Sequence, residues 1–257
     1  MNGNQYPIYY VGGGKGGVGK SLFSFALTEY LLSQNRNLLL VDTDTDNPDV
    51  FKSHEGLGLA NLHCLMNSLD SADGWADLLD TVQLFPEHVV LINAAARTKT
   101  STANYGEIMQ GALQEVGRTL TVFWLINRHR DSIELLHSFQ QAFPDTIIHA
   151  CRNLYFGEPE RFDTYNGSKM REVVEQVGQT LDFPVVANRV TDWLYSKRMA
   201  IRAAIPEMPL GTRVELMRWR TRCGELFDRG LMEPKPESPK AEPESTATTP
   251  ETPEVEV

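Results

Sequence analysis

Cysteine is scarce in this 257-residue chain, and the three cysteines that it has are far apart. Cys64, Cys151 and Cys223 form no Cys-x-x-Cys pair, and no Cys/His spacing suggests a zinc site. Three isolated cysteines also argue against a disulfide framework and against the paired ligands of an iron–sulfur cluster. The simplest interpretation is three reduced thiols in a cytoplasmic protein.

Long apolar runs are missing as well. No stretch approaches the ~20 apolar residues that a membrane-spanning helix needs, so the sequence carries no strong membrane signal. Residues 1–7 lack a basic segment followed by an apolar one, which makes a secretory signal unexpected. Both observations favour a cytoplasmic location.

Negative charge is concentrated at one end of the chain. The net charge is −10, and residues 231–257 hold seven glutamates against two lysines, a balance of −5. This segment is rich in Pro, Glu, Ser and Thr and has almost no large apolar residues, so it cannot offset the entropy of ordering. We predict a folded domain over 1–230 and a disordered acidic tail over 231–257. A basic patch on the mildly acidic body stays possible.

Six short apolar runs alternate with helix-like segments in the body of the chain. Each run is continuous rather than alternating, as expected of strands that are buried on both faces. The pattern predicts an α/β fold with a doubly wound, mostly parallel β-sheet flanked by helices. The predicted strands are 6–11, 37–41, 88–92, 120–126, 146–151 and 183–187, and the predicted helices are 20–34, 106–115, 131–142, 169–179, 192–204 and 212–229.

Residues 12–21 read GGGKGGVGKS, after a predicted strand and before a predicted helix. The P-loop pattern GxxxxGK[ST] is met by Gly14, Gly19, Lys20 and Ser21. Glycines let backbone N–H groups approach phosphate oxygens, Lys20 reaches the β- and γ-phosphates, and the Ser21 hydroxyl ligates Mg²⁺. A merely flexible glycine turn would not need the GKS ending, so we predict ATP and Mg²⁺ as ligands. The nucleotide-binding set is Gly14, Lys15, Gly16, Gly17, Val18, Gly19, Lys20, Ser21 and Leu22.

A second lysine, Lys15, lies inside the glycine run, and an ordinary P-loop does not need it. With KGGVGKS over 15–21, the chain resembles the deviant Walker A ATPases of the ParA/MinD group. The resemblance implies an ATP-dependent homodimer that sandwiches the nucleotides, with Lys15 contacting the phosphates bound by the other subunit. The alternative is a solvated loop lysine.

Four aspartates follow the second apolar run, in the sequence LLLVDTDTDNPDV over 38–50. Carboxylates beyond the carboxyl ends of strands can hold Mg²⁺ or orient an attacking water molecule. The family's two aspartates separated by one residue match Asp42 and Asp44. The resemblance implies that Asp44 positions the water, as a catalytic residue beside Lys15 and Lys20, and that Asp42 lies nearer the metal. Asp46 and Asp49 look like turn residues.

The third predicted strand departs from the family pattern. Asn93 stands where the family has an aspartate that holds Mg²⁺ through water, and the switch segment that follows is reduced to residues 94–97, AAAR. Asparagine can hydrogen-bond to a metal-bound water but brings no charge. Nucleotide binding is still expected with Asn93, but fast hydrolysis is not. Either slow, partner-gated hydrolysis or nucleotide-dependent switching with little turnover would fit the sequence.

Two features of the second half bear on ligands and partners. Asn153 follows the fifth strand at the family's base-contacting position and is the candidate adenine contact, with Asn188 and Arg189 as weaker ones. Segment 212–229 is amphipathic, and its arginines suit DNA, a DNA-binding partner protein or a membrane surface. The plain alternative is a packed helix with a solvated arginine face. The arginines are Arg213, Arg218, Arg220, Arg222 and Arg229.

Within the group, the layout most resembles the TraL/StbC-like ATPases of plasmid transfer and stability. The similar features are the glycine loop close to the N-terminus, Asn93 in place of the aspartate, and the loop over 153–162. Three classes of function compete. They are a partner-gated ATPase that positions DNA or a protein complex, a nucleotide-dependent switch or scaffold, and an ATP-using metabolic enzyme of the same fold.

Overall fold

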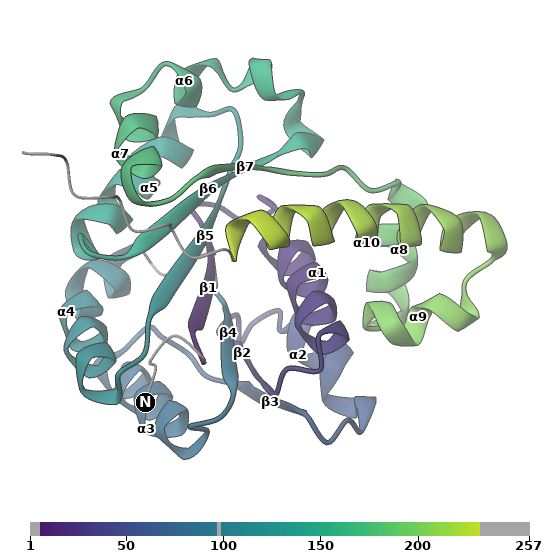
Figure 1. The fold of residues 1–257 in the computed structure, drawn as a ribbon, viewed down its shortest axis with the longest axis horizontal. Helices are drawn as coiled ribbons and strands as arrows, with labels where there is room; N and C mark the ends of the chain where they lie inside the picture. Colours follow the sequence, from purple (N-terminus) through teal and green to yellow (C-terminus); the bar gives the residue numbers. More distant parts are fainter. Residues whose placement is uncertain (1–5, 97–98, 232–257) are drawn as a thin grey trace, which may run out of the picture.

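The computed structural model describes residues 6–96 and 99–231 of the chain (Figure 1). Within that part, seven parallel strands form one sheet in the order β3-β2-β4-β1-β5-β6-β7. The predicted α/β class with a parallel sheet is confirmed. The strands are β1 (Ile8–Gly13), β2 (Leu38–Asp42), β3 (Leu62–Met66), β4 (Val89–Asn93), β5 (Leu120–Ile126), β6 (Ile147–Asn153) and β7 (Thr180–Phe183).

Helices cover both faces of this sheet, and each face has its own apolar core. Helices α1, α2, α8, α9 and α10 pack on one face, and α3 to α7 pack on the other (Figure 1). The helices are α1 (Lys20–Ser33), α2 (Asp49–His54), α3 (Ala72–Leu84), α4 (Lys99–Val116), α5 (Arg130–Ala142), α6 (Asp163–Asn166), α7 (Lys169–Val177), α8 (Asn188–Lys197), α9 (Ile201–Glu207) and α10 (Leu210–Gly230). The 3₁₀ turns are η1 (Glu55–Leu57), η2 (Leu154–Phe156) and η3 (Pro159–Arg161).

Strand β1 lies at the centre of the sheet, between β4 and β5, and leads into the glycine-rich loop. Every residue of β1, β2 and β4 is buried, which is why these strands read as continuous apolar runs. In such a sheet, ligands bind beyond the carboxyl ends of the strands where the strand order reverses. Here the order reverses on either side of β1, directly beside the loop.

One strand, β3, and three helices, α2, α3 and α6, were not predicted. Strand β3 is at the edge of the sheet, is only partly buried and contains His63 and Cys64, so it lacks the continuous apolar run of the central strands. Helix α3 does carry a signal: the Ser71 hydroxyl accepts from the Gly74 amide as an N-cap, and Trp75, Leu78 and Val82 share the buried face.

The helix predicted over 106–115 begins earlier, at Lys99, and two other predicted elements differ more from the observed ones. The strand predicted over 183–187 is wrong in position: β7 spans Thr180–Phe183 and shares only Phe183 with it. Pro184 ends the strand because it has no N–H to donate to a neighbouring strand. Its apolar residues form a loop instead, in which Val186 is buried. The helix predicted over 192–204 is two helices, α8 and α9, separated at Arg198, which adopts a left-handed conformation with φ of 49°.

Most of the acidic segment predicted over 231–257 lies outside the described residues, as does Arg97. Among the described residues, no helix combines the length and the apolar character that crossing a membrane requires. Cys64, Cys151 and Cys223 are free thiols.

Candidate functional site

The loop between β1 and α1 has a backbone shape that depends on glycine. Gly17 has φ of 74° and Gly19 has φ of 104°, both in the region that L side chains rarely adopt. A Cβ atom on Gly19 would also lie 2.5 Å from Nδ2 of Asn153. Gly19 is the N-cap residue of α1, so the positive end of that helix faces the space beside the loop. This geometry suits a phosphate group.

Lys20, in the first turn of α1, is a buried lysine with 8% of its surface exposed. Burial lowers the pKa of its ammonium group to about 8, and the negative charge of Asp44 opposes that shift. Its Nζ donates to the Lys15 carbonyl oxygen at 3.2 Å. A desolvated ammonium group inside a glycine loop gains strongly from an anion placed against it.

Lys15 lies at the rim of the loop, where it forms an ion pair with Asp131 at the start of α5. Both side chains are about half exposed. Nearby, a Cβ atom on Gly14 would clash with the Leu135 side chain of α5, so the start of the loop packs directly on that helix. The lysine expected to contact a second subunit is therefore paired within its own chain in this structure.

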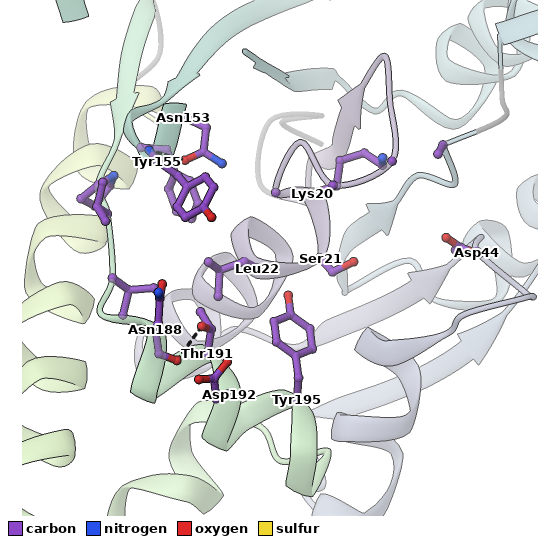
Figure 2. Close-up of a pocket in the computed structure, with 18 of the residues that line it drawn as sticks. Lys20, Ser21, Leu22, Asp44, Asn153, Tyr155, Asn188, Thr191, Asp192 and Tyr195 are labelled. Carbon is purple, nitrogen blue, oxygen red and sulfur yellow. Dashed lines mark hydrogen bonds between the residues drawn. The ribbon is translucent and has the colours of Figure 1, made fainter. Parts of the chain in front are cut away.

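Asp44 and Ser21 line the same cavity as Lys20. The Asp44 carboxylate accepts one hydrogen bond from the Asn47 backbone N–H at 3.1 Å, and its backbone N–H donates to Asp42. Asp44 thus retains acceptor capacity that faces the cavity (Figure 2). A serine hydroxyl and a carboxylate that share a cavity with a buried lysine are groups able to hold a magnesium–triphosphate complex.

Asp42 and Asn93 lie on adjacent strands, opposite each other in the register of β2 and β4. Asp42 is fully buried and accepts hydrogen bonds from the backbone N–H groups of Asp44, Val50 and Phe51 and from the Asn93 side chain. Burial raises the pKa of its carboxyl group, and these hydrogen bonds oppose the rise. Asp42 does not line the cavity, so its predicted place near the metal stays a prediction.

Asn153, the predicted base contact, does line the cavity, and it also joins two segments of the wall. Its Nδ2 donates to the Val18 carbonyl oxygen at 2.9 Å, and its Oδ1 accepts from the Tyr155 backbone N–H at 3.0 Å. Only 6% of Asn153 is exposed. Asn153 therefore connects the glycine-rich loop with the turn η2.

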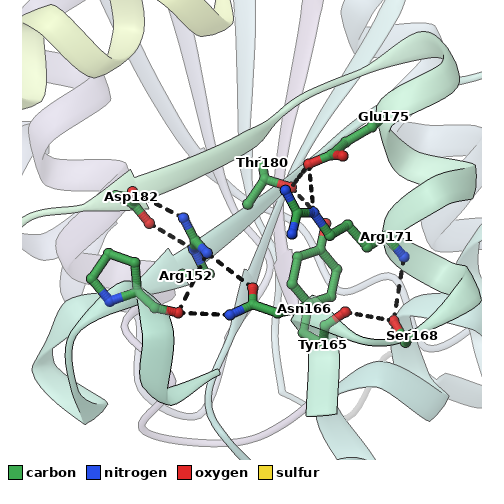
Figure 3. Close-up of polar contacts among 9 residues, drawn as sticks. Arg152, Tyr165, Asn166, Ser168, Arg171, Glu175, Thr180 and Asp182 are labelled. Atoms are coloured by element: carbon green, nitrogen blue, oxygen red, sulfur yellow. Dashed lines mark hydrogen bonds and ion pairs between the residues drawn. The ribbon is translucent and has the colours of Figure 1, made fainter. Parts of the chain in front are cut away.

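The segment after β6 is anchored by Arg152 (Figure 3). The guanidinium group donates to both carboxylate oxygens of Asp182 on β7, at 2.7 and 3.1 Å. It also donates to the Asn166 side chain at 2.9 Å and to the Pro159 carbonyl oxygen at 3.4 Å. These contacts hold η3 and α6 against the ends of β6 and β7 and so fix the loop that carries Tyr155.

The cavity has a volume of about 580 Å³, which is in the range of small-molecule sites. Figure 2 shows Asp44 on one side of it and Tyr155 on the other, with Ser21 and Leu22 between them. Asn188 and the loop over 153–162 were predicted from the sequence, but most of the wall formed by the β7–α8 segment and by α8 was not. The residues missed are Pro184, Val185, Val186, Thr191, Asp192 and Tyr195. Among the described residues, no cluster of three or more His, Cys, Asp or Glu side chains could hold a metal.

Helix α10 confirms the amphipathic helix expected over 212–229, and it separates the arginines into two groups. Arg220 pairs with Glu29 of α1 at 2.9 Å, and Arg202 of α9 pairs with the other oxygen of the same carboxylate at 2.9 Å. Glu29 is 4% exposed. Arg218 and Arg222, in contrast, are exposed to solvent. Arg220 therefore belongs to the packing of the helix and not to the basic surface expected from the sequence.

Comparison with known proteins agrees with this architecture. The family model described as "CobQ/CobB/MinD/ParA nucleotide binding domain" matches residues 9–231. Protein MobD of Acidithiobacillus ferrooxidans is 44% identical over 222 residues, which cover 86% of this chain and 96% of that protein. Protein TraL of Escherichia coli is 24% identical over 158 residues, covering 60% of this chain and 65% of that protein.

A solved structure of McdA from Cyanothece in complex with ATP has a TM-score of 0.52 with this chain at 17% identity. The match covers 86% of this chain and 97% of McdA, and it shows that the two share a fold. Family membership is shown by the family model, which matches residues 9–231, and by the 44% identity with MobD. The chain belongs to the CobQ/CobB/MinD/ParA family of nucleotide-binding domains.

Proposed function

We propose that this chain binds ATP with Mg²⁺, dimerises on ATP and hydrolyses it slowly, under the control of a DNA or protein partner. The observation that carries the proposal is the meeting of Lys20, Ser21 and Asp44 in one cavity, at a loop whose backbone requires Gly17 and Gly19. The glycine loop and the start of α1 bind the phosphates through backbone N–H groups. Lys20 supplies the positive charge that the β- and γ-phosphates need.

The donor set around Ser21 fits Mg²⁺. One hydroxyl and one carboxylate with free acceptor capacity, completed by phosphate oxygens and water, match the preference of this ion for a few protein ligands. When bound, Mg²⁺ offsets the charge of the phosphates. Asp44 has the chemistry to orient the attacking water by accepting a hydrogen bond from it. Lys20 stabilises the charge that develops on the transferred phosphoryl group.

Lys15 is the residue that would link two copies of the chain. Its ion pair with Asp131 is half exposed, so little free energy is lost when Lys15 leaves Asp131. Lys15 could then contact the phosphates of a nucleotide bound by a second subunit. In the dimer, Lys15 would approach the nucleotide of the partner subunit while Lys20 holds its own. The domain over 1–230 carries all of these parts, and the acidic segment over 231–257 follows it.

A nucleotide-dependent switch with little hydrolysis is the second candidate, and Asn93 favours it. The carboxamide takes the position of the family's metal-side aspartate and is committed to Ser24 and Asp42. It therefore offers no negative charge to the metal shell. In this candidate the ATP-bound dimer is the active state, and it persists until a partner displaces the nucleotide.

The cargo in both candidates is DNA or a DNA-bound protein complex, in plasmid transfer, partition or positioning, in the cytoplasm. Support comes from the similarity to MobD and TraL and from the exposed Arg218 and Arg222 of α10.

The test is ATP binding and steady-state turnover, with and without duplex DNA, for the wild type, Lys20→Ala and Asp44→Ala. Lys20→Ala should weaken ATP binding by more than about tenfold, the loss expected for a charge-assisted contact. Asp44→Ala should bind ATP but lose turnover. If the wild type and Asp44→Ala bind ATP and turn it over equally poorly in every condition, the hydrolysis proposal is lost and the switch remains. If Lys20→Ala binds ATP as the wild type does, the site itself is wrong.

A further inference from the structure

Exposed apolar side chains gather at the end of the cavity that is distant from Asp44. Tyr155 is 67% exposed and Val185 is 47% exposed, and both line the cavity that contains Lys20. A large apolar side chain left in contact with water inside a concave site indicates a ligand surface more often than one on open surface does. These two side chains come from different segments, η2 and the loop after β7.

The position of Tyr155 is fixed from several directions. Its backbone N–H donates to Asn153, and its ring packs edge-on against Phe156 with centroids 5.5 Å apart. Arg152 ties the rest of the loop to β7 and α6. The ring is thus exposed but attached to an ordered turn, so the entropic cost of stacking a ligand on it is small.

Asn153 has a supporting role in this arrangement. The side-chain amide reaches the phosphate loop at Val18 on one side and the backbone of Tyr155 on the other. One residue therefore sets the distance between the place where the phosphates bind and the aromatic ring. In Figure 2 the ring lies on the side of the cavity away from Asp44.

We propose that Tyr155 is the residue on which the nucleobase stacks, with Val185 as an apolar neighbour and Asn153 as the residue that positions the ring. This inference rests on the proposed nucleotide site and names the side chain that holds the base. Aromatic stacking accepts any base with a π face, and a purine offers the larger face. The site therefore prefers purine to pyrimidine nucleoside triphosphates.

Two probes separate base recognition from phosphate recognition: ATP and inorganic tripolyphosphate, each with Mg²⁺. Both have a triphosphate for the glycine loop, but only ATP has a base. We expect Tyr155→Ala to raise the Kd for ATP by about tenfold, the size typical of base–aromatic stacking, and to leave the Kd for tripolyphosphate within about twofold. Tyr155→Phe keeps the ring and should keep the affinity for ATP.

A matched control is Leu84→Ala, which removes a side chain that is 78% exposed at the end of α3, away from the cavity. It should change neither Kd. As a second measurement, the adenine protons of bound ATP should shift upfield in the wild type and in Tyr155→Phe, because of the ring current, and lose this shift in Tyr155→Ala.

The outcomes distinguish the two proposals. An unchanged ATP Kd in Tyr155→Ala, or an equal loss for tripolyphosphate, overturns the stacking role while the nucleotide site stands. An unchanged ATP Kd combined with weaker self-association would assign Tyr155 to a contact between protein chains instead. Failure of the wild type to bind either probe overturns the proposed function itself.

Discussion

The side-chain amide of Asn93 donates a hydrogen bond to the buried carboxylate of Asp42, with 2.9 Å between Nδ2 and Oδ1. The carbonyl oxygen of the same amide accepts from the Ser24 hydroxyl at 2.9 Å. The amide nitrogen of Asn93 thus donates to Asp42, and its amide oxygen accepts from Ser24. A carboxylate at position 93 would offer only acceptors and would face Asp42 with a like charge.

Replacement of Asn93 by aspartate should therefore destabilise the fold. Loss of the donor and placement of a second carboxylate in a buried site should reduce the free energy of unfolding by about 2–4 kcal/mol near neutral pH. The repulsion raises the pKa of one carboxyl group of the pair in the folded state. The penalty is then absent below the unfolded pKa and complete above the folded one, so the variant should approach the wild type in stability as the pH falls.

Urea unfolding of Asn93→Asp at several pH values measures this effect. Gln141→Glu makes the same amide-to-carboxylate change at an exposed position on α5 and should be close to neutral. Equal stability of Asn93→Asp and the wild type at neutral pH would contradict the pairing with Asp42.

The affinity for ATP should depend on pH through Lys20. Its pKa is lowered to about 8 by burial, and a bound triphosphate raises it again because the anion favours the ammonium form. Below pH 8 the lysine of the free protein is already protonated, and the affinity does not change on its account. Above pH 8 binding must take up a proton, so the affinity should fall by up to about tenfold per pH unit.

Calorimetric titration with ATP between pH 7 and pH 9.5 provides the measurement. The Lys20→Met variant keeps an apolar stem of similar length without the titrating group, so it should bind weakly with a flatter profile. A wild-type profile that stays flat across this range would refute the role of Lys20.

The ion pair between Lys15 and Asp131 should oppose dimerisation. Asp131→Asn removes the charge that holds Lys15 within its own chain, so ATP should induce the dimer at a concentration lower by a few-fold at most, since surface ion pairs are weak. Light scattering with ATP and with ADP tests this, with Asp145→Asn on the exposed surface as the control. A chain that stays monomeric with ATP in both forms would remove the role given to Lys15.

The exposed arginines of α10 should contribute to DNA binding. A double change, Arg218→Ala with Arg222→Ala, removes two positive charges, so it should weaken binding to duplex DNA regardless of base sequence. The slope of log K against log salt concentration should fall by about 2. Arg130→Ala, on the exposed start of α5, is the matched control. An unchanged slope would mean that DNA does not contact this helix.

The central strands and the phosphate loop could be predicted because the physical cause of each is local in sequence. A strand buried on both faces must be apolar throughout, as in β2, and a loop with φ above zero at Gly17 and Gly19 needs glycine. The alternation of strands and helices predicts the parallel sheet, but the position of β1 at the switch in strand order comes from the structure.

The cavity wall formed by the segment after β7 and by α8 was harder to predict, because it depends on tertiary contacts. Residues 184–186 are apolar, so the sequence pattern predicts a strand there. Pro184 ends the hydrogen bonding of β7 at Phe183, and residues 184–186 line the cavity instead. The partners of Asp42 could not be predicted either. Only the register of β2 with β4 brings Asn93 to it, and only the fold of α2 brings the backbone of Val50 and Phe51.

Glu29 connects α1 to two other helices, α9 and α10. The helix starts at the phosphate loop, and two turns later the arginines of α9 and α10 hold Glu29 from two sides. A tilt of α1 when the loop closes on a nucleotide would therefore pull on both helices at once. The surface of α10 that carries Arg218 and Arg222 would turn with it. A single buried carboxylate thus joins the helix that begins at the glycine-rich loop to the helix that carries the exposed arginines.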